Sequence, residues 1–143
     1  MKINRASALW KGSLKKGVGT VQLSSVRKEV MLYTFASRFE DGTGTNPEEL
    51  IAAAHAACFS MALSGVLSEN GFEPKSISTS AEVKIEKSGE GFKISESTLV
   101  TNAEIESIDE ATFIKLAEEA KVNCPVSKAL TSVKIILQAN LVQ

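Results

Sequence analysis

The segment NPEELIAAAHAACFSMAL, residues 46–63, restricts the possible folds of this chain more than any other stretch. Asn46 and Pro47 are typical of the start of a helix, and Glu49, three residues after Asn46, can complete a capping box. From Leu50 to Leu67 the expected helix is apolar on every face and carries no charge, apart from a possible one on its single histidine. Such a helix must be covered on all sides, either by protein or by lipid.

Protein is the better of these two covers. The apolar run is rich in small residues, is flanked by glutamates rather than by Lys or Arg, and is marginal in length for a bilayer. A single sheet in a chain of this length covers only one side of the helix. The small residues favour close packing against a second helix, and they are Ala52, Ala53, Ala56, Ala57 and Gly65. We therefore expect a two-fold homodimer with paired central helices.

Length and composition predict one domain over residues 1–143. A chain of 143 residues with 43% hydrophobic content can bury a substantial core. Sixteen Lys and Arg against seventeen Asp and Glu leave a formal charge of -1, so the basic footprint of a nucleic-acid binder is missing. The first residues lack the apolar core of a secretory signal, so we expect a cytoplasmic protein. Two cysteines are too few for a disulfide scaffold and are expected to matter as thiols.

The remaining sequence predicts an α+β domain with a largely antiparallel sheet. Apolar alternation predicts an N-terminal antiparallel β-meander, with strands at 2–11, 18–24 and 30–39. A second hairpin is expected from strands at 76–87 and 91–104. A helix pair follows: Asp109 can cap the first member, whose apolar stripe is Phe113, Leu116, Ala117 and Ala120, and CPVSKAL begins the second. The final strand is SVKIILQANLV.

Cys58 lies halfway along the apolar helix, and two interpretations of it are open. Free Cys behaves as a small hydrophobe and is among the most buried residue types. The functional interpretation starts from Glu48, which at 100° per residue lies about 80° from Cys58 around the helix but roughly 15 Å away along its axis. Arg38, just before the loop that leads into the helix, could bridge the carboxylate and a thiolate. A solvated arginine at a strand end is the ordinary alternative.

Cys124 and His55 suggest competing chemistry. Cys124 precedes Pro125 at the predicted start of a helix, where the helix dipole lowers a thiol pKa, so electrostatics alone favours Cys124 as the thiolate. His55 and Cys58 share one helix face, but a Cys–His nucleophile also needs an orienting group and an open cleft, so a core or interface histidine is expected. A single histidine and the lack of a C-x-x-C motif argue against a zinc site, and no cofactor fingerprint is present. We therefore expect no metal and no cofactor.

Three segments closely resemble the OsmC/Ohr family of thiol-dependent hydroperoxide reductases. They are SRFEDGTGTNPEEL, NPEELIAAAHAACFSMAL and CPVSKAL, and the order of strands and helices fits the family along the whole chain. Within the family the sequence is more similar to the OsmC branch than to the Ohr branch. The resemblance implies an OsmC-like fold in which sheets wrap the paired central helices of a homodimer.

The resemblance also implies a role for each of four residues. Cys58 matches the peroxidatic cysteine, Cys124 the resolving cysteine, Arg38 the arginine that activates the thiolate, and Glu48 the glutamate that orients this arginine. The implied reaction is reduction of organic hydroperoxides, and less efficiently of hydrogen peroxide, through a Cys58 sulfenic acid and a Cys58–Cys124 disulfide. An external dithiol of the lipoyl type is the implied reductant.

Apolar walls around the site, with aromatic residues such as Phe39 and Phe59 or their neighbours, would favour organic peroxides. A protein of a different class remains an alternative: a thiol redox sensor or stress-induced binding protein without turnover. An assay with excess dithiol and peroxide distinguishes the enzyme from the sensor or binding protein, because only an enzyme consumes many equivalents of peroxide.

Overall fold

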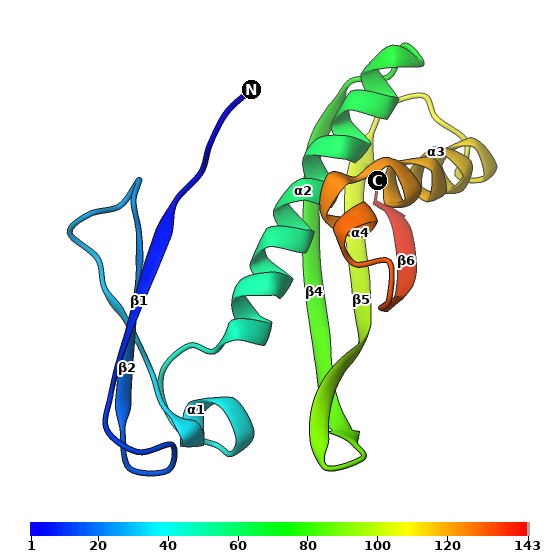
Figure 1. Cartoon of the computed structure of the whole chain (residues 1–143). Helices are drawn as coiled ribbons and strands as arrows, with labels where there is room; N and C mark the ends of the chain where they lie inside the picture. Colours follow the sequence, from blue (N-terminus) through cyan, green and yellow to red (C-terminus); the bar gives the residue numbers. More distant parts are fainter. Residues whose placement is uncertain (143) are drawn as a thin grey trace. The chain divides into compact units, whose positions relative to one another are not determined.

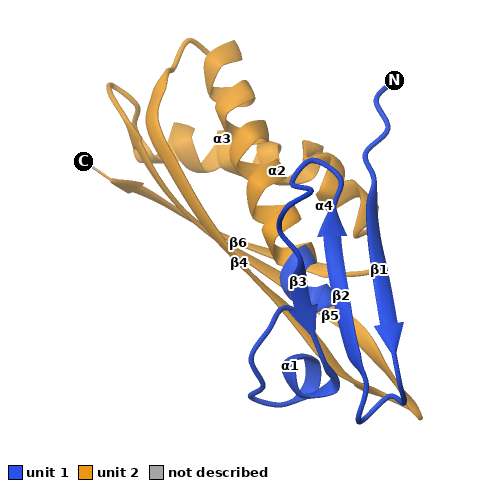
Figure 2. Cartoon of the chain, turned by 90° about the vertical axis from the view of Figure 1, so that its left-hand side faces the viewer, with its two compact units in different colours: residues 1–50 blue, residues 51–143 orange. Residues whose placement is uncertain are grey.

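The computed structural model describes residues 1–142 and divides into two compact units, residues 1–50 and the chain from residue 51 onward (Figures 1 and 2). Each unit holds one three-stranded sheet, with order β1-β2-β3 in the first and β4-β5-β6 in the second. Together with helices α1 to α4 these sheets make an α+β fold, as the sequence predicts. The grouping of residues 1–143 into a single domain stays a prediction.

The first unit contains the predicted antiparallel meander. Strands β1 (Ala6–Lys11), β2 (Val18–Leu23) and β3 (Met31–Tyr33) pair in sequence order. The third predicted strand, 30–39, is wrong beyond Tyr33, because Phe35–Phe39 forms the short helix α1. Arg38 therefore lies in the last turn of a helix and not at the end of a strand.

Local hydrogen bonds explain why α1 replaces the predicted strand. The Thr34 side chain accepts a hydrogen bond from the Ser37 backbone at 3.1 Å, and the Ser37 hydroxyl accepts one from the Thr34 backbone at 2.8 Å. The Ala36 carbonyl then accepts from the backbone N–H groups of Glu40 and Gly42, which ends the helix. Such side-chain bonds offer the backbone an alternative to the sheet, and here they prevail over the apolar alternation.

Helix α2 (Pro47–Glu69) begins as predicted, with one difference. The Asn46 side chain accepts a hydrogen bond from the Glu49 backbone at 2.8 Å, which confirms the N-cap. The predicted return bond from Glu49 to the Asn46 backbone is replaced by another contact, because the Glu49 carboxylate accepts a hydrogen bond from the Thr45 hydroxyl at 3.1 Å.

One face of α2 remains exposed in the single chain. By length and composition the helix could cross a membrane, and only 22% of its most apolar window is buried within the single chain. Its exposed residues include Ala53, Ala57, Met61 and Gly65, which we call the α2 stripe. Because these positions are four residues apart, they lie along one side of the helix.

The second unit consists of β4 (Pro74–Ser88), β5 (Gly91–Ile105), α3 (Glu110–Asn123), α4 (Pro125–Ala129) and β6 (Lys134–Val142), together with most of α2. Strands β4 and β5 form the predicted hairpin, whereas β6 pairs in parallel with β5. The parallel pairing follows from the connection, since α3 and α4 carry the chain back from the end of β5 and β6 then begins at Lys134, opposite Glu96 of β5 (Figure 1).

The core of the second unit fixes α2 against β5 and α3. Residues from all three elements are fully or almost fully buried: Phe59, Leu63 and Leu67 on α2, Leu99 and Ala103 on β5, and Phe113, Leu116, Ala117 and Ala120 on α3. The last four are the predicted apolar stripe. Asp109 caps α3 as predicted by accepting a hydrogen bond from the Thr112 backbone at 2.9 Å. This core holds the middle of α2, where Cys58 lies, next to the start of α4.

Candidate functional site

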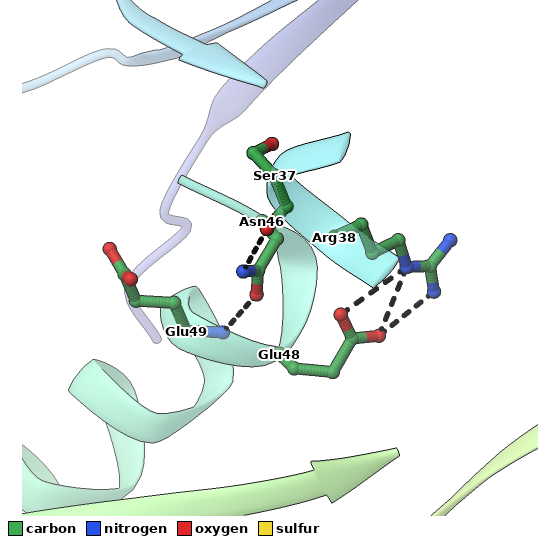
Figure 3. Close-up of polar contacts among 5 residues, drawn as sticks. All are labelled: Ser37, Arg38, Asn46, Glu48 and Glu49. Carbon is green, nitrogen blue, oxygen red and sulfur yellow. Dashed lines mark hydrogen bonds and ion pairs between the residues drawn. The ribbon is translucent and has the colours of Figure 1, made fainter. Parts of the chain in front are cut away.

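A compact set of hydrogen bonds ties α1 to the first turn of α2 (Figure 3). The Ser37 hydroxyl donates to the Thr45 carbonyl at 2.8 Å, and the Asn46 side-chain amide donates to the Ser37 carbonyl at 2.9 Å. The preceding Gly44 has φ of +119°, and a Cβ there would lie 2.6 Å from the Leu32 carbonyl oxygen, so this turn requires glycine. The loop thus brings the end of α1 against the start of α2.

Arg38 and Glu48 form an ion pair at this junction (Figure 3). Nη2 of Arg38 lies 2.8 Å from Oε1 of Glu48, and Nε lies 3.3 and 3.2 Å from the two carboxylate oxygens. The Glu48 side chain is 6% exposed and the Arg38 side chain 38%. Both carboxylate oxygens are therefore engaged by one edge of the guanidinium, which holds the plane of the arginine in a defined orientation.

An aromatic cavity of about 240 Å³ lies beside the guanidinium of Arg38. Its lining consists of Trp10, Leu14, Tyr33, Thr34, Phe35, Arg38 and Phe39. The ring centroids of Trp10 and Tyr33 are 5.4 Å apart, and those of Phe35 and Phe39 are 5.0 Å apart. Of the two aromatic residues singled out in the sequence, Phe39 lines this cavity, whereas Phe59 is fully buried in the core of the second unit.

The two cysteines meet in the second unit. Cys58, on α2, is half-buried, and Cys124, between α3 and α4, is fully buried. Both are free thiols, and they lie close enough for each to shift the pKa of the other. Cys124 is the N-cap residue of α4 and is followed by Pro125 in the first turn, as the sequence predicts.

The surroundings of the two thiols shift their pKa values in opposite directions. Burial and the hydrogen bond with Cys124 raise the pKa of Cys58, against the effect of a bond from the Val126 backbone. Burial also opposes ionisation of Cys124, but hydrogen bonds from the Cys58 thiol and from the backbone and hydroxyl of Ser127 lower the pKa of Cys124 below its ordinary value. Within this unit a negative charge is therefore better stabilised on Cys124 than on Cys58.

His55 is part of the core, as expected, and is hydrogen-bonded at both ring nitrogens. Nδ1 lies 2.7 Å from the Ser97 hydroxyl and Nε2 lies 2.9 Å from the Ser127 hydroxyl. Burial lowers the pKa of His55, which favours the neutral imidazole. The sequence analysis missed both serines. Ser127 could have been found, because it lies three residues after Cys124 in CPVSKAL and so in the first turn of the expected helix. Ser97 could not, because it lies 42 residues from His55 and no local pattern connects the two.

The structure therefore brings the four residues together as two pairs. Arg38 and Glu48 meet in residues 1–50, and Cys58 and Cys124 meet in the chain from residue 51 onward. Contact between the guanidinium and the thiols, and the catalytic roles of all four residues, stay predictions.

Comparison with known proteins identifies the family. A family model described as OsmC-like protein matches residues 40–138. The chain is 48% identical over 126 residues to "Peroxiredoxin OsmC" from Escherichia coli strain K12, a match that covers 88% of each chain. It is 42% identical over 91 residues to "Organic hydroperoxide resistance protein OhrB" from Bacillus subtilis strain 168, covering 63% of this chain and 65% of that protein.

Solved structures agree with the sequence comparison. The crystal structure of the organic hydroperoxide resistance protein OhrB of Bacillus subtilis matches 95% of this chain and 98% of its own, with 30% identity and a TM-score of 0.74. Sequence match and fold thus agree along almost the whole length, and the chain belongs to the OsmC-like protein family.

Proposed function

We propose that this protein is a cysteine-based peroxidase that reduces organic hydroperoxides to alcohols and water. The observation that carries the proposal is the pair of neighbouring free thiols, Cys58 and Cys124, at the edge of a buried core. Relatives named as a peroxiredoxin and as hydroperoxide resistance proteins support the same chemistry.

The proposed reaction has two chemical steps in the thiol pair. The Cys58 thiolate attacks the terminal oxygen of the hydroperoxide, so that an S–O bond forms as the O–O bond breaks. The products are a Cys58 sulfenic acid and an alkoxide, which takes a proton to become the alcohol. The Cys124 thiolate then attacks the Cys58 sulfur, forming the disulfide and releasing hydroxide, which becomes water on protonation. An external dithiol, proposed to be of the lipoyl type, returns the disulfide to two thiols by exchange.

A cation beside Cys58 is needed for the first step. Within the second unit the pKa of Cys58 is raised and the charge of the pair resides better on Cys124. Arg38 is the proposed cation, because an opposite charge at close range favours the ionised thiol. Glu48 orients it, because the carboxylate holds one edge of the guanidinium and leaves the other edge for the thiolate or the peroxide.

The aromatic cavity beside Arg38 supports organic substrates. Its lining is dominated by the rings of Trp10, Tyr33, Phe35 and Phe39, and an alkyl or aryl group can replace water against such rings. Hydrogen peroxide has no apolar group to bury there, so we propose that it is the poorer substrate.

Assembly and location complete the proposal. The exposed α2 stripe needs an apolar cover, and we propose that the same stripe of a second copy provides it in a homodimer. Because the cycle requires free thiols and a dithiol reductant, we propose that the protein works in the reducing cytoplasm.

The test is a peroxidase assay with cumene hydroperoxide or hydrogen peroxide and excess dihydrolipoamide. We expect many turnovers per protein and a higher kcat/KM for cumene hydroperoxide. Cys58→Ser should abolish peroxide consumption, whereas Cys124→Ser should consume one equivalent and leave a sulfenic acid that dimedone traps. Consumption of a single equivalent by the wild-type protein despite excess dithiol would instead identify a redox sensor, and sulfenic acid trapped at Cys124 would reverse the roles of the two thiols.

A further inference from the structure

A line of buried side chains leads from β5 through α2 to the first turn of α4, where Cys124 is the N-cap residue. The Ser97 hydroxyl lies 2.7 Å from Nδ1 of His55, and Nε2 of His55 lies 2.9 Å from the Ser127 hydroxyl. Ser127 lies in the first turn of α4, whose N-cap residue is Cys124, and its side chain is among the groups that lower the pKa of the Cys124 thiol. Ser97, His55 and Cys124 are fully buried and Ser127 is 7% exposed, so water does not readily substitute for these contacts.

The direction of these bonds follows from the number of protons available. A Cys124 thiolate can only accept, so the single hydroxyl proton of Ser127 must point at the sulfur. The Ser127 oxygen must then accept its bond with His55, which places the ring proton on Nε2. Nδ1 accepts in turn from the Ser97 hydroxyl. Burial favours the neutral ring, so one tautomer of His55 fits a Cys124 thiolate.

We infer that His55 and Ser127 are positioning residues for the resolving step, in which His55 fixes the Ser127 hydroxyl as a hydrogen-bond donor to the sulfur of Cys124. The inference rests on the proposed function. In that step the Cys124 thiolate forms the S–S bond with Cys58 while the S–O bond of the sulfenic acid breaks. The Cys124 sulfur is oxidised, the Cys58 sulfur is reduced, and the departing hydroxide takes a proton to become water.

Two titratable groups interact with Cys124 through this arrangement: the Cys58 thiol directly, and His55 through Ser127. The charged side chains nearest to it in sequence have other surroundings. On α3, Lys121 is paired with Glu118 at 2.8 Å, and on α4, Lys128 is exposed. The hydrogen bond from Ser127 is therefore the contact to change first.

The first experiment measures the pKa of Cys124 in a Cys58→Ser background, where it is the only thiol. Thiolate absorbance at 240 nm and the rate of alkylation are followed against pH. Adding Ser127→Ala should raise the pKa by about one unit, and so reduce the thiolate fraction at neutral pH about tenfold, because it removes a hydrogen bond to the charged form. Ser60→Ala is the matched control, since the Ser60 hydroxyl binds the Ala56 carbonyl and Thr79 instead.

The role of His55 is tested in the same background. His55→Leu removes the N–H that the Ser127 oxygen accepts, so the hydroxyl can turn away from the sulfur and the Cys124 pKa should rise. His55→Gln keeps an N–H donor on the same side and should restore most of the effect. If His55→Leu does not fold, Ser97→Ala serves in its place, because it releases the ring tautomer. Equal Cys124 pKa values in the folded Leu (or Ser97→Ala) and Gln variants would overturn the role of His55.

The second experiment follows a single turnover with both cysteines present. With one equivalent of cumene hydroperoxide, Ser127→Ala should consume peroxide at the wild-type rate but form the disulfide about tenfold more slowly at neutral pH. Dimedone added at intervals reports the Cys58 sulfenic acid that accumulates, and the deficit should shrink as the pH approaches the raised pKa of Cys124.

Two negative results have different meanings. Normal peroxide consumption with an unchanged Cys124 pKa and an unchanged resolving rate in folded Ser127→Ala overturns this inference alone. A wild-type protein that consumes no hydroperoxide overturns the proposed function and the resolving role with it.

Discussion

The two thiols show how far hydrogen bonds can outweigh burial at single residues. Cys124 is the more deeply buried of the two, yet its pKa is lowered, whereas the pKa of half-buried Cys58 is raised. The difference arises because Cys124 accepts bonds from Ser127 and from Cys58 itself. Among the described residues no cation contributes to the shift of the Cys58 pKa. A peroxidatic Cys58 would need one, and this makes Arg38 the most informative residue to change.

Arg38→Met should raise the pKa of Cys58. The expected rise is roughly 1 to 3 units, since an opposite charge within about 4 to 6 Å favours the ionised form by that amount. Glu48→Gln should show a smaller effect, because it loosens the arginine without removing it, and Arg38→Lys should rescue poorly, because Lys lacks the planar fork. The measurement is the rate of Cys58 alkylation against pH in a Cys124→Ser background.

The exposed Arg27 supplies the control for this series. Arg27→Met makes the same chemical change at a surface position and should leave the alkylation profile in place. Overlapping profiles for Arg38→Met and Arg27→Met, with equal peroxide consumption, would contradict the proposed role of Arg38 and favour an arginine that serves only the local structure.

His55 predicts how stability depends on pH. Burial lowers its folded-state pKa below the ordinary 6.5, so below that value the unfolded chain binds more protons than the folded one. The free energy of unfolding is thus fully retained above about pH 6.5 and falls as the pH decreases toward the folded-state pKa, by at most about 1.4 kcal/mol per pH unit. Urea unfolding between about pH 7.5 and 5.5 measures this slope.

The comparison variant is His55→Gln, because His55 is the only histidine in the chain. Gln does not titrate, so its stability should change much less over the same range, whatever its absolute value. Asp109 does not interfere, since hydrogen bonds from Thr112 lower the pKa of its carboxyl and place its titration further toward acid. Equal slopes in the two proteins would show that His55 is not the group responsible.

Among the elements, those with strong periodicity or a clear cap could be predicted from sequence. Helix α3 has both, with Asp109 at its N-cap and Phe113 on its buried stripe. Helix α1 could not be predicted, because its cap depends on a Thr34–Ser37 pair that is weaker than the usual Ser/Thr–Glu signature, while the alternating aromatics favour a strand. The parallel pairing of β6 depends on the whole α3–α4 connection, which local patterns do not contain.

The same distinction applies to the candidate site. The four residues were located through the family resemblance, and each pair comes together through contacts that periodicity cannot give. Arg38 approaches Glu48 because Ser37 and Asn46 tie α1 to α2. This contact could be predicted only if residues 35–39 were first recognised as a helix and not as a strand. Ser97 was missed since it contacts His55 only through the tertiary fold.

The junction of α1 and α2 yields a prediction about Asn46. The side-chain oxygen of Asn46 caps α2, and its side-chain amide group donates to the Ser37 backbone carbonyl. Substitutions can therefore remove one contact without the other. Asn46→Asp keeps the cap and loses the donor, whereas Asn46→Ala loses both and should cost about 1 kcal/mol in stability. We expect the stability of Asn46→Asp to stay within several tenths of a kcal/mol of the wild-type value, because the cap is kept. Peroxide consumption should fall, because α1, which carries Arg38, is no longer tied to α2 by Asn46.

Urea unfolding and single-turnover peroxide consumption distinguish these outcomes. Asp at position 46 also places a negative charge against the Ser37 carbonyl, which should move α1 away from α2. Wild-type peroxide consumption in Asn46→Asp would mean that the tether from Asn46 to Ser37 does not position Arg38 for catalysis.

At the scale of the whole molecule, the main constraint is the same one that the sequence presents first. Helix α2 is apolar on all faces, and its own chain covers one of them with β5 and α3. On the α2 stripe Met61 is 78% exposed, and a Cβ built on Gly65 would meet nothing within 4 Å. An uncovered stripe of small residues and one methionine permits the close approach of a second helix, and a two-fold axis would place the same stripe of another copy there.

The α2 stripe therefore carries the prediction about assembly. The wild-type protein should sediment as a dimer, and Ala57→Asp should weaken that dimer at least about 100-fold, because two-fold symmetry places two unpaired carboxylates in one apolar contact, and about 2.7 kcal/mol suffices for that factor. Ala111→Asp, at an exposed position in the first turn of α3, is the matched control and should remain dimeric. Analytical ultracentrifugation over a range of protein concentrations measures both. Two results would contradict this prediction: a stable wild-type monomer that reduces hydroperoxide, and an Ala57→Asp dimer as tight as the control. Either would show that the α2 stripe is not the interface and that α2 is covered in some other way.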